Sequence, residues 1–185
     1  FQQAVGYASD RRQGKTPSGN TAIIDPADVR RMLAEMKAET FAARAIGLSC
    51  AIAIDMARAT KDPQWQARAA FLTPIAKAYG TDTGNHVAQL GIQVHGGMGF
   101  IEETGAAQFA RDVRVTSIYE GTNGIQAMDL VGRKMMDGGE AAVRLIGEMP
   151  DAAEATRGTL PDRATPLLHA AEAVREAPVP LIALD

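Results

Sequence analysis

One carboxylate in the segment TSIYEGTNGIQ, residues 116–126, is the main candidate for acid–base chemistry in this sequence. Glu120 stands between Tyr119 and Gly121, two positions before Thr122, a residue type that often caps helices. At such a junction a carboxylate can point into a cavity, where partial removal of water would make it a better general base. The local alternative is a solvated glutamate that interacts with the dipole of the next helix.

The glycine-rich stretch HGGMGF, residues 95–100, is a second candidate. Its G-x-G pattern belongs to a dinucleotide site only when it follows a strand, and here it follows a helix-like segment, so that interpretation is rejected. Two interpretations stay open. The glycines let the backbone approach a ligand closely, or they form a tight turn between helices.

The remaining reactive side chains indicate structure rather than chemistry. The histidines His86, His95 and His169 form no pair with metal-ligand spacing and a third ligand nearby, so we predict no metal site. Cys50 lies in a very apolar segment and is expected to be a buried, inert thiol. The methionines are expected to fill the core, namely Met32, Met36, Met56, Met128, Met135 and Met136.

The elements that must position these residues are predicted to be helices, because alternating β-branched runs are missing. The fold class is therefore all-α, an antiparallel bundle of long helices. We expect helices at residues 1–12, 25–60, 62–79, 82–94, 102–111, 122–136, 139–148 and 163–177. Loop residues are Gly14, Pro17, Gly19 and Asn20 near the start, and a Pro/Gly linker between the last two helices.

The longest expected helix, residues 25–60, has Asp25 as its cap and Pro26 at its first position. Between residues 45 and 57 apolar residues surround it, which predicts burial on several sides. Its apolar stripe comprises Val29, Met32, Leu33, Met36, Thr40, Phe41, Ala43, Ile46 and Gly47. The inner side of the helix at 122–136 is expected to carry Ile125, Met128, Leu130 and Val131.

Composition excludes several classes of protein. The chain has 185 residues, 46% apolar and 22% charged, as in ordinary globular proteins. A net charge of -3 disfavours nucleic-acid binding. A single cysteine excludes an internal disulfide. The sequence contains no run of about 18 apolar residues, so we expect no membrane span. With no targeting signal visible, we expect a cytoplasmic protein.

The ends of the sequence and its composition predict the domain organisation. The chain begins at Phe1, as if within a helix, and has no initiator methionine, so we expect a fragment of a longer parent. After residue 136 the sequence becomes rich in proline and alanine. We therefore predict one helical domain at 1–136 and the start of an appended helical region at 137–185.

The segment QVHGGMGFIEETGAAQFARDVRVTSIYEGTNGIQ, residues 93–126, resembles the C-terminal signature of the acyl-CoA dehydrogenase family. The family pattern is Q-x-x-G-G-x-G-[FY], a short helix ending in R-D, then I-Y-E-G-T and I-Q. Upstream, YASDRRQGK resembles the family's Y-A-x-x-R-x-x-F-G, and VRRMLAEMKAETFAAR resembles the long helix after it. The resemblance covers roughly residues 1–134. It is specific in residue type, order and spacing.

The resemblance implies a C-terminal four-helix bundle that completes a unit with an N-terminal helical domain and a middle β-domain. It implies FAD-dependent α,β-dehydrogenation of an acyl-CoA to the 2-enoyl-CoA. The glutamate of Y-E-G-T, here Glu120, removes the α-proton while hydride passes to flavin N5, and its backbone N–H helps to polarise the thioester carbonyl. Tyr119 and Gly121 would lie beside the substrate. The appended region is similar to that of longer bacterial members, including those acting on methylthio-substituted acyl-CoAs.

The resemblance also implies contacts with FAD. Arg11 matches an arginine that reaches the pyrophosphate across a subunit interface, and Thr122 matches a threonine near the flavin phosphates. The stretch that holds the adenine end, also from a neighbouring subunit, corresponds to Gln93, Gly96 and Gly97. Departures from the family pattern at Ala27 and Gly124, where the family often has glutamine, indicate altered FAD contacts. The phenylalanine before the glycine of the first motif is also missing, because Gln13 is followed directly by Gly14.

The resemblance implies three kinds of partner: an acyl-CoA, further copies in a homodimer or homotetramer, and an electron-transfer flavoprotein as acceptor. Two alternatives stay open, a non-catalytic helical oligomerisation module and an acyl-CoA oxidase. A family flavoprotein that binds DNA is disfavoured by the net charge of -3 and by the absence of a basic run in the last 50 residues.

Overall fold

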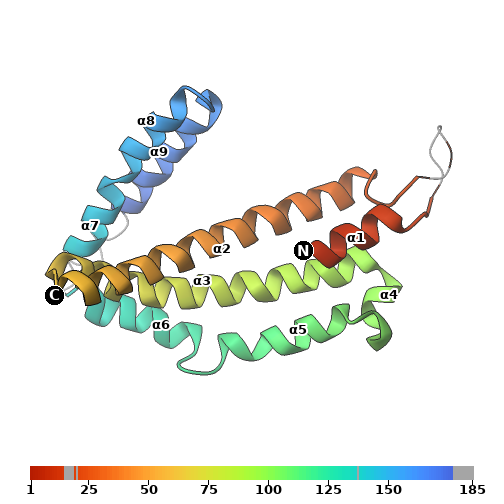
Figure 1. Ribbon diagram of the computed structural model, residues 1–185, viewed down its shortest axis with the longest axis horizontal. Coiled ribbons are helices and arrows are strands. Elements are labelled where there is room, and N and C mark those ends of the chain that lie inside the picture. The colour runs from red at the N-terminus through yellow and green to blue at the C-terminus, as the bar shows by residue number, and fades with distance from the viewer. Residues whose placement is uncertain (15–18, 20, 137, 177–185) are drawn as a thin grey trace. The chain divides into compact units, whose positions relative to one another are not determined.

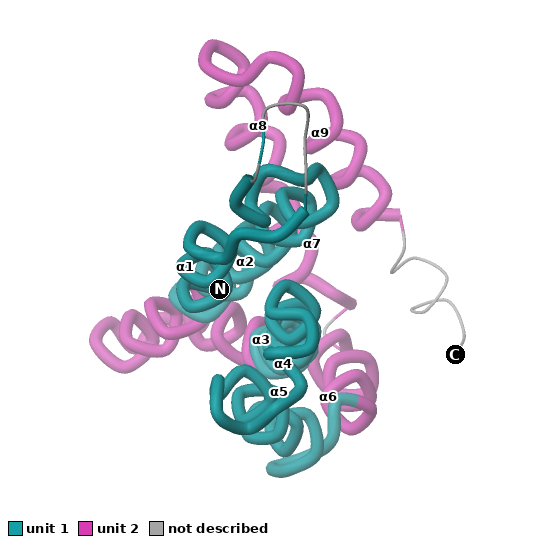
Figure 2. Tube along the Cα trace, turned by 90° about the vertical axis from the view of Figure 1, so that its right-hand side faces the viewer, with its two compact units in different colours: residues 1–48, 76–123 teal, residues 49–75, 124–185 magenta. Residues whose placement is uncertain are grey.

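The computed structural model describes residues 1–14, 19, 21–136 and 138–176, and most of these lie in helices (Figure 1). They form two compact units, residues 1–48 with 76–123 and residues 49–75 with 124–185 (Figure 2). Among the described residues, an isolated antiparallel β-bridge joins Arg12 to Ala22. The prediction of an all-α fold is confirmed.

Two long helices form an antiparallel hairpin. Helix α1 spans Gln2–Asp10, α2 spans Ala27–Thr60 and α3 spans Pro63–His95 (Figure 1). Between α2 and α3, Lys61 adopts a left-handed backbone conformation with φ 59°. Asp62 then caps α3, because its carboxylate accepts a hydrogen bond from the Gln64 backbone N–H at 2.8 Å. The predicted helix at 25–60 is confirmed, with its first residue at Ala27.

The predicted break between residues 79 and 82 is wrong, because α3 continues through Gly80 and Gly84. A glycine within a helix costs only about 1 kcal/mol relative to alanine, so packing can override it. The packing is visible at Gly84, where a Cβ atom would lie 2.9 Å from Val113 Cγ2. The glycine here serves the close approach of another helix rather than the end of α3.

The core of the first unit gathers small and flexible side chains from three helices. It comprises Ala4, Ala8, Met32, Leu33, Met36 and Val94. Met36 is 1% exposed, and burying a side chain of this size stabilises the fold by roughly 1.5–3 kcal/mol. The predicted apolar stripe is thus confirmed as far as Met36. Phe41, farther along the same stripe, is 75% exposed, so the prediction fails there.

Short elements follow α3 within the first unit. Gly96 adopts φ 60° and separates α3 from α4, Gly97–Phe100. A 3-10 turn, Glu102–Thr104, precedes helix α5, Ala106–Arg114, and a second, Val115–Ser117, follows it. HGGMGF therefore does form a turn between helices. The single helix predicted at 102–111 is a turn and a helix.

The second unit contains the other ends of α2 and α3 and the helices of the C-terminal part. Helix α6 spans Asn123–Asp129 and continues as a π-helical stretch, Leu130–Lys134. Helices α7, Glu140–Gly147, α8, Met149–Arg157, and α9, Pro161–Glu176, follow. Its core comprises Phe71, Ala141, Ala142 and Ile146.

The linker predicted between the last two helices is wrong, because residues 149–157 form α8. Pro150 lies in the first turn of α8, where its missing N–H breaks no helical hydrogen bond. The predicted helices at 139–148 and 163–177 correspond to α7 and α9. Predictions for Pro17, Asn20 and residue 177 fall outside the described residues.

Several apolar side chains predicted to be buried are exposed in this chain. Ile125, Met128 and Val131 of the α6 region are 52%, 70% and 43% exposed, and Met136 is 72% exposed. Cys50, by contrast, is buried as predicted, with its Sγ 3.7 Å from Thr73 Oγ1. Helical periodicity identifies an apolar face, but it does not say whether the same chain covers that face.

The same exposure extends along α2, where Leu48 is 64% and Ile52 is 57% exposed, so the predicted burial on several sides is wrong for this chain. Among the described residues, α2 contains a window of 18 residues apolar enough to cross a membrane, with mean hydropathy 1.4 and 11% of the window buried. This finding rests on length and composition alone, and one such helix is weak support for a membrane span. The expectation of no membrane span stays a prediction.

Candidate functional site

The loop that carries Glu120 joins the turn after α5 to helix α6. The backbone N–H of Tyr119 donates to Val115 O at 3.1 Å and closes the preceding turn. Glu120 is exposed and adopts φ 51°, the left-handed region, and Gly121 follows with φ 87°. A non-glycine residue in this region costs roughly 1–2 kcal/mol. Glycine at position 121 gives the second left-handed residue without that cost.

A cluster of polar side chains fastens this loop to α3. The Lys77 ammonium donates to Gly121 O and to Asn123 Oδ1, both at 2.8 Å. The Asn123 amide donates in turn to Asp82 Oδ1 at 2.6 Å and to Thr81 Oγ1 at 3.0 Å. Sequence reasoning missed Lys77 and Asn123. They are 46 residues apart, and an isolated lysine in a helix carries no signal of such a contact.

Of the residues predicted to contact FAD, Thr122 lies on the loop of Glu120, and the others, namely Arg11, Gln93, Gly96 and Gly97, lie near the C-terminal end of α3. Gln93 is in its last turn, and Gly96 and Gly97 follow it, all three exposed. Next to them, the buried His95 stacks on Tyr7 of α1 with ring centroids 4.4 Å apart. Its Nδ1 donates to Gly91 O at 2.7 Å. The stacking of Tyr7 on His95 holds the end of α1, and with it Arg11, near the end of α3.

The exposed Arg11 ends α1, with its backbone N–H donating to Tyr7 O at 2.9 Å. Among the described residues, the Arg11 guanidinium donates one long hydrogen bond, 3.5 Å to Gln13 Oε1. The charge is thus available to an anion. Gly96 and Gly97 have no heavy atom within 4 Å of an added Cβ, which leaves room for a ligand to approach the backbone. These features fit the diphosphate and adenine of FAD.

The structure does not bring the two groups of candidate residues together within one chain. Gln93 follows Lys77 by sixteen positions on α3, so at about 1.5 Å per residue the two lie roughly 24 Å apart along the helix. The group at 119–122 and the group around Arg11 and Gln93 are therefore separate. This separation accords with the implied role of Arg11 and Gln93 towards a neighbouring subunit.

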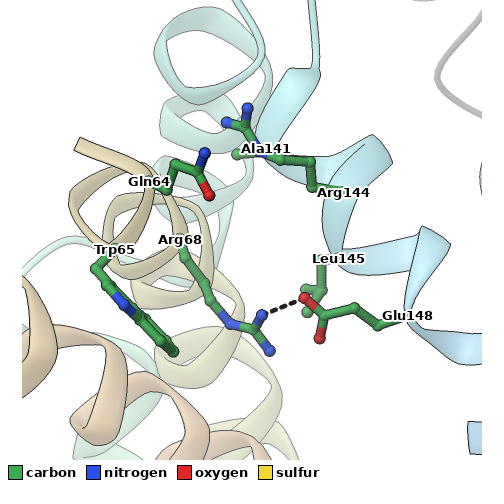
Figure 3. A pocket seen from close by; sticks show the side chains of 7 residues that line it. All are labelled: Gln64, Trp65, Arg68, Ala141, Arg144, Leu145 and Glu148. Atoms are coloured by element: carbon green, nitrogen blue, oxygen red, sulfur yellow. Dashed lines mark hydrogen bonds and ion pairs between the residues drawn. The ribbon is translucent and has the colours of Figure 1, made fainter. Parts of the chain in front are cut away.

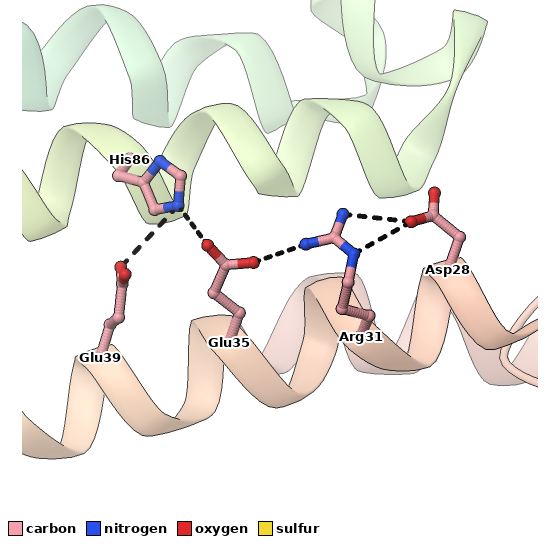
Figure 4. A network of polar contacts seen from close by, with 5 residues as sticks. All are labelled: Asp28, Arg31, Glu35, Glu39 and His86. Atoms are coloured by element: carbon pink, nitrogen blue, oxygen red, sulfur yellow. Dashed lines mark hydrogen bonds and ion pairs between the residues drawn. The ribbon is translucent and has the colours of Figure 1, made fainter.

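A third cluster joins α2 to α3 in the first unit (Figure 4). His86 Nε2 lies 2.9 Å from Glu35 Oε1 and 4.0 Å from Glu39 Oε2, and the three ligand atoms lie within 4.8 Å of one another. The hydrogen bond from His86, and beyond it the Arg31 guanidinium at 2.7 Å, hold the pKa of Glu35 below its usual value. Sequence reasoning missed this grouping because it compared histidines only with one another.

Ion pairs account for this cluster without a metal. Arg31 links Glu35 to Asp28, at 3.1 Å, so a row of alternating charges runs along α2 (Figure 4). A metal ion bound by His86 Nε2 and Glu35 Oε1 would have to replace the hydrogen bond between these two atoms. The cluster is therefore assigned to helix pairing.

Cavities occur in both units. In the second unit a cavity of about 260 Å³ is lined by Trp65, Arg68 and Glu148 among others (Figure 3). The Arg68 guanidinium lies 5.7 Å from the centroid of the Trp65 ring and donates to Glu148 at 2.5 Å. The Glu148 carboxylate therefore already neutralises its charge. In the first unit a larger, mostly apolar cavity of about 490 Å³ lies between α1, α3 and α5, next to His95 and Phe109.

Comparisons with known proteins agree on one family. The family model described as "Acyl-CoA dehydrogenase, C-terminal domain" matches residues 1–136. The 3-methylmercaptopropionyl-CoA dehydrogenase of Ruegeria pomeroyi is 44% identical over 161 residues, 83% of this chain and 27% of that protein. A butyryl-CoA dehydrogenase of Syntrophomonas wolfei is 38% identical over 160 residues, 82% of this chain and 26% of that protein.

A solved structure shares the fold. Caenorhabditis elegans ACDH-11, solved in complex with C11-CoA, aligns with a TM-score of 0.78 at 21% identity, over 94% of this chain and 29% of that one. This likeness shows the arrangement of helices and nothing about substrates. The chain spans little more than a quarter of each relative, 27% and 26%.

Proposed function

The chain belongs to the acyl-CoA dehydrogenase family, and we propose that the protein of which it is part converts an acyl-CoA thioester into the 2-enoyl-CoA. The observation that carries the proposal is the Y-E-G-T motif at residues 119–122, which stands on a loop where an exposed Glu120 adopts a left-handed backbone conformation. Left-handed non-glycine residues cluster at functional sites, where the surrounding contacts hold them in place.

Glu120 is the proposed base. The α-proton of an acyl thioester is weakly acidic, so a carboxylate must be held against it while the β-hydrogen leaves as hydride. The backbone N–H of Glu120 is proposed to donate to the thioester carbonyl, which stabilises the charge that develops on its oxygen. Tyr119, 51% exposed, and Gly121 flank the base and are the proposed substrate contacts.

FAD is the proposed cofactor, and when bound it supplies the hydride acceptor. Arg11 would pair with the diphosphate, for which a guanidinium is suited. Gln93, Gly96 and Gly97 would receive the adenine end, and Thr122 would lie near the phosphates. Because the loop of Glu120 is attached to α3 at Lys77, roughly 24 Å along the helix from Gln93, we propose that Arg11 and Gln93 serve the FAD of a neighbouring subunit.

The proposed assembly is a homodimer or homotetramer, and the proposed electron acceptor is an electron-transfer flavoprotein. The proposed domain organisation is a bundle at residues 1–136 followed by an appended helical region at 137–185. The two most similar relatives reported above are named for short acyl-CoAs, one of them a thioether. We therefore propose a short or methylthio-substituted acyl chain.

The experiment uses the intact parent protein, purified with FAD. Acyl-CoAs that differ in chain length and branching are added without oxygen, and the absorbance of the oxidised flavin is followed at about 450 nm. We expect bleaching with short acyl-CoAs. We expect Glu120→Gln to bind acyl-CoA but to reduce its flavin about 10²- to 10⁴-fold more slowly, as the loss of a base implies.

The matched control is Glu154→Gln, which removes an exposed carboxylate in α8 that pairs only with Arg157 among the described residues. It should reduce its flavin at the rate of the unaltered protein. Normal reduction by Glu120→Gln would disprove the role of the base. Bound FAD without bleaching by any acyl-CoA would favour the non-catalytic module.

A further inference from the structure

The loop at 119–122 has to hold Glu120 in a backbone conformation that glutamate does not favour. With φ 51° at Glu120 and φ 87° at Gly121, two successive residues are left-handed. Left to its own preferences, position 120 would relax to a right-handed or extended conformation, which would turn its side chain in another direction. Contacts on both sides of Glu120 must therefore maintain the conformation.

Before Glu120 the restraint is a backbone turn. Val115 O accepts hydrogen bonds from Ile118 N at 2.9 Å and from Tyr119 N at 3.1 Å. After Glu120, a side chain of another helix contacts the backbone. Lys77 of α3 donates to Gly121 O at 2.8 Å. The carbonyl of Gly121 belongs to the Gly121–Thr122 peptide, so this contact fixes the backbone directly after the left-handed pair Glu120-Gly121.

Lys77 is suited to this contact in several ways. Its side chain is half-buried, where a hydrogen bond from a cation is stronger than in water. Its second acceptor, Asn123 Oδ1 at 2.8 Å, belongs to the first residue of α6. No ion pair of Lys77 occurs among the described residues. Both of its described hydrogen bonds therefore go to the segment that carries Glu120.

Asn123 completes the attachment. Its amide donates to Thr81 Oγ1 at 3.0 Å and to Asp82 Oδ1 at 2.6 Å, one turn along α3 from Lys77. Asn123 thus accepts from one turn of α3 and donates to the next. Two turns of a rigid helix hold the residues after Glu120, so the loop cannot rotate about a single contact.

We infer that Lys77, together with Asn123, is the positioning residue for the proposed base, because it fixes the backbone directly after Glu120 and Gly121 and thereby the direction of the carboxylate. This inference rests on the proposed function, and it adds two residues that do not touch the reacting atoms. A base displaced by 1 Å from its substrate can lose about 100-fold in rate. Loss of Lys77 should therefore slow proton removal while leaving acyl-CoA binding nearly unchanged.

The test compares variants of the intact parent with FAD bound. Lys77→Met keeps the length of the apolar stem and removes the donor, and Lys77→Arg keeps a cationic donor. Lys37→Met is the matched control, an exposed lysine on α2. The readout is exchange of the α-hydrogens of butyryl-CoA with deuterium from D2O, followed by mass spectrometry without an electron acceptor. Affinity for butyryl-CoA is measured alongside.

We expect Lys77→Met to slow α-hydrogen exchange by about 10- to 100-fold, with the dissociation constant changed less than about threefold and the thermal midpoint within a few degrees. Asn123→Ala should act in the same direction, Lys77→Arg should restore most of the rate, and Lys37→Met should change nothing. Exchange at the unaltered rate by a folded Lys77→Met variant would overturn the inference. So would parallel losses of binding and stability, which indicate a purely structural role.

A second measurement separates this inference from the proposed function. Backbone amide hydrogen exchange at residues 116–123 reports the order of the loop whether or not any acyl-CoA reacts. Lys77→Met should raise these rates, and Lys37→Met should not. If the unaltered parent exchanges no α-hydrogens, the proposed function fails, and faster amide exchange would then still support the attachment of the loop by Lys77. Unchanged amide rates would overturn the attachment.

Discussion

At position 120, folding and chemistry favour different residues. Glycine adopts a left-handed backbone conformation most readily, and asparagine and aspartate do so less readily, yet position 120 carries glutamate. The unfavourable conformation is offset by the hydrogen bonds that Lys77 donates to Gly121 O and Asn123 Oδ1. Such a residue is more readily explained by what its side chain does than by what it contributes to stability.

At Glu35 the pairing of α2 with α3 depends on pH. The hydrogen bond from His86, helped by Arg31, lowers the pKa of Glu35 from its usual 4.5. A carboxyl group whose pKa is lower in the folded state stabilises the fold above its unfolded pKa, and the contribution disappears as pH falls through the folded pKa.

We therefore expect Glu35→Gln to lower the thermal midpoint of the chain at pH 6 but to change it little at pH 3. The measurement is thermal unfolding followed by circular dichroism from pH 3 to pH 6. Glu39→Gln, whose carboxylate lies 4.0 Å from His86, is the comparison and should have the smaller effect. An equal deficit of Glu35→Gln at pH 3 and at pH 6 would contradict the assignment.

At the scale of elements, the turn between α3 and α4 depends on one glycine. A Cβ atom at Gly99 would lie 2.2 Å from Ile92 O, far inside the contact distance, and that oxygen belongs to the backbone and cannot move aside. Gly99→Ala must therefore displace α4 from the end of α3. We expect a loss of at least about 2 kcal/mol in the free energy of unfolding, measured by urea denaturation.

The control for this variant is Gly97→Ala in the same short helix. A Cβ atom there meets nothing within 4 Å, so the change should stay within about 0.5 kcal/mol. If both variants lose stability equally, crowding at Ile92 is not the cause.

The sequence predicts helices more reliably than the places where they end. The stripe through Met32 and Met36, with Pro26 before it, located α2 to within two residues. A break is predicted between residues 79 and 82, and a Pro/Gly linker between the last two helices, although α3 runs through Gly80 and α8 contains Pro150. At Gly80, packing outweighs a helix propensity of about 1 kcal/mol. Pro150 lies in the first turn of α8, where proline is tolerated, so it begins a helix rather than interrupting one.

The candidate site was predictable only in part. Glu120 was found from the order of residues in a family motif, since its immediate neighbours left a solvated glutamate as an alternative. Lys77 could not be found, because its contacts with Gly121 and Asn123 join residues 44 and 46 positions apart. The exposure of Phe41 was not predictable either, because periodicity marks an apolar face without saying which chain covers it.

At the scale of the whole molecule, exposed apolar side chains on α2 support the proposed assembly. Phe41, Leu48 and Ile52 are 75%, 64% and 57% exposed. Exposed apolar residues that recur along one helix are typical of an interface. We propose that a second copy of the parent covers this face of α2.

Leu48→Glu should then shift the parent towards smaller species, because an unpaired carboxylate would be buried at the interface. Analytical ultracentrifugation at several concentrations measures this. The control is Val174→Glu, the same kind of change at an exposed position in α9. An unchanged sedimentation coefficient for Leu48→Glu would place the interface elsewhere.

Helices α2 and α3 each contribute residues to both compact units, so each unit contains only part of these two helices. Melting one unit would remove backbone hydrogen bonds from helices that the other unit also requires. Helix formation is cooperative along a continuous run, so the shared helices link the two units during unfolding. The division into units therefore describes packing, and it does not mark a boundary at which the protein could be cut into two independently folding parts.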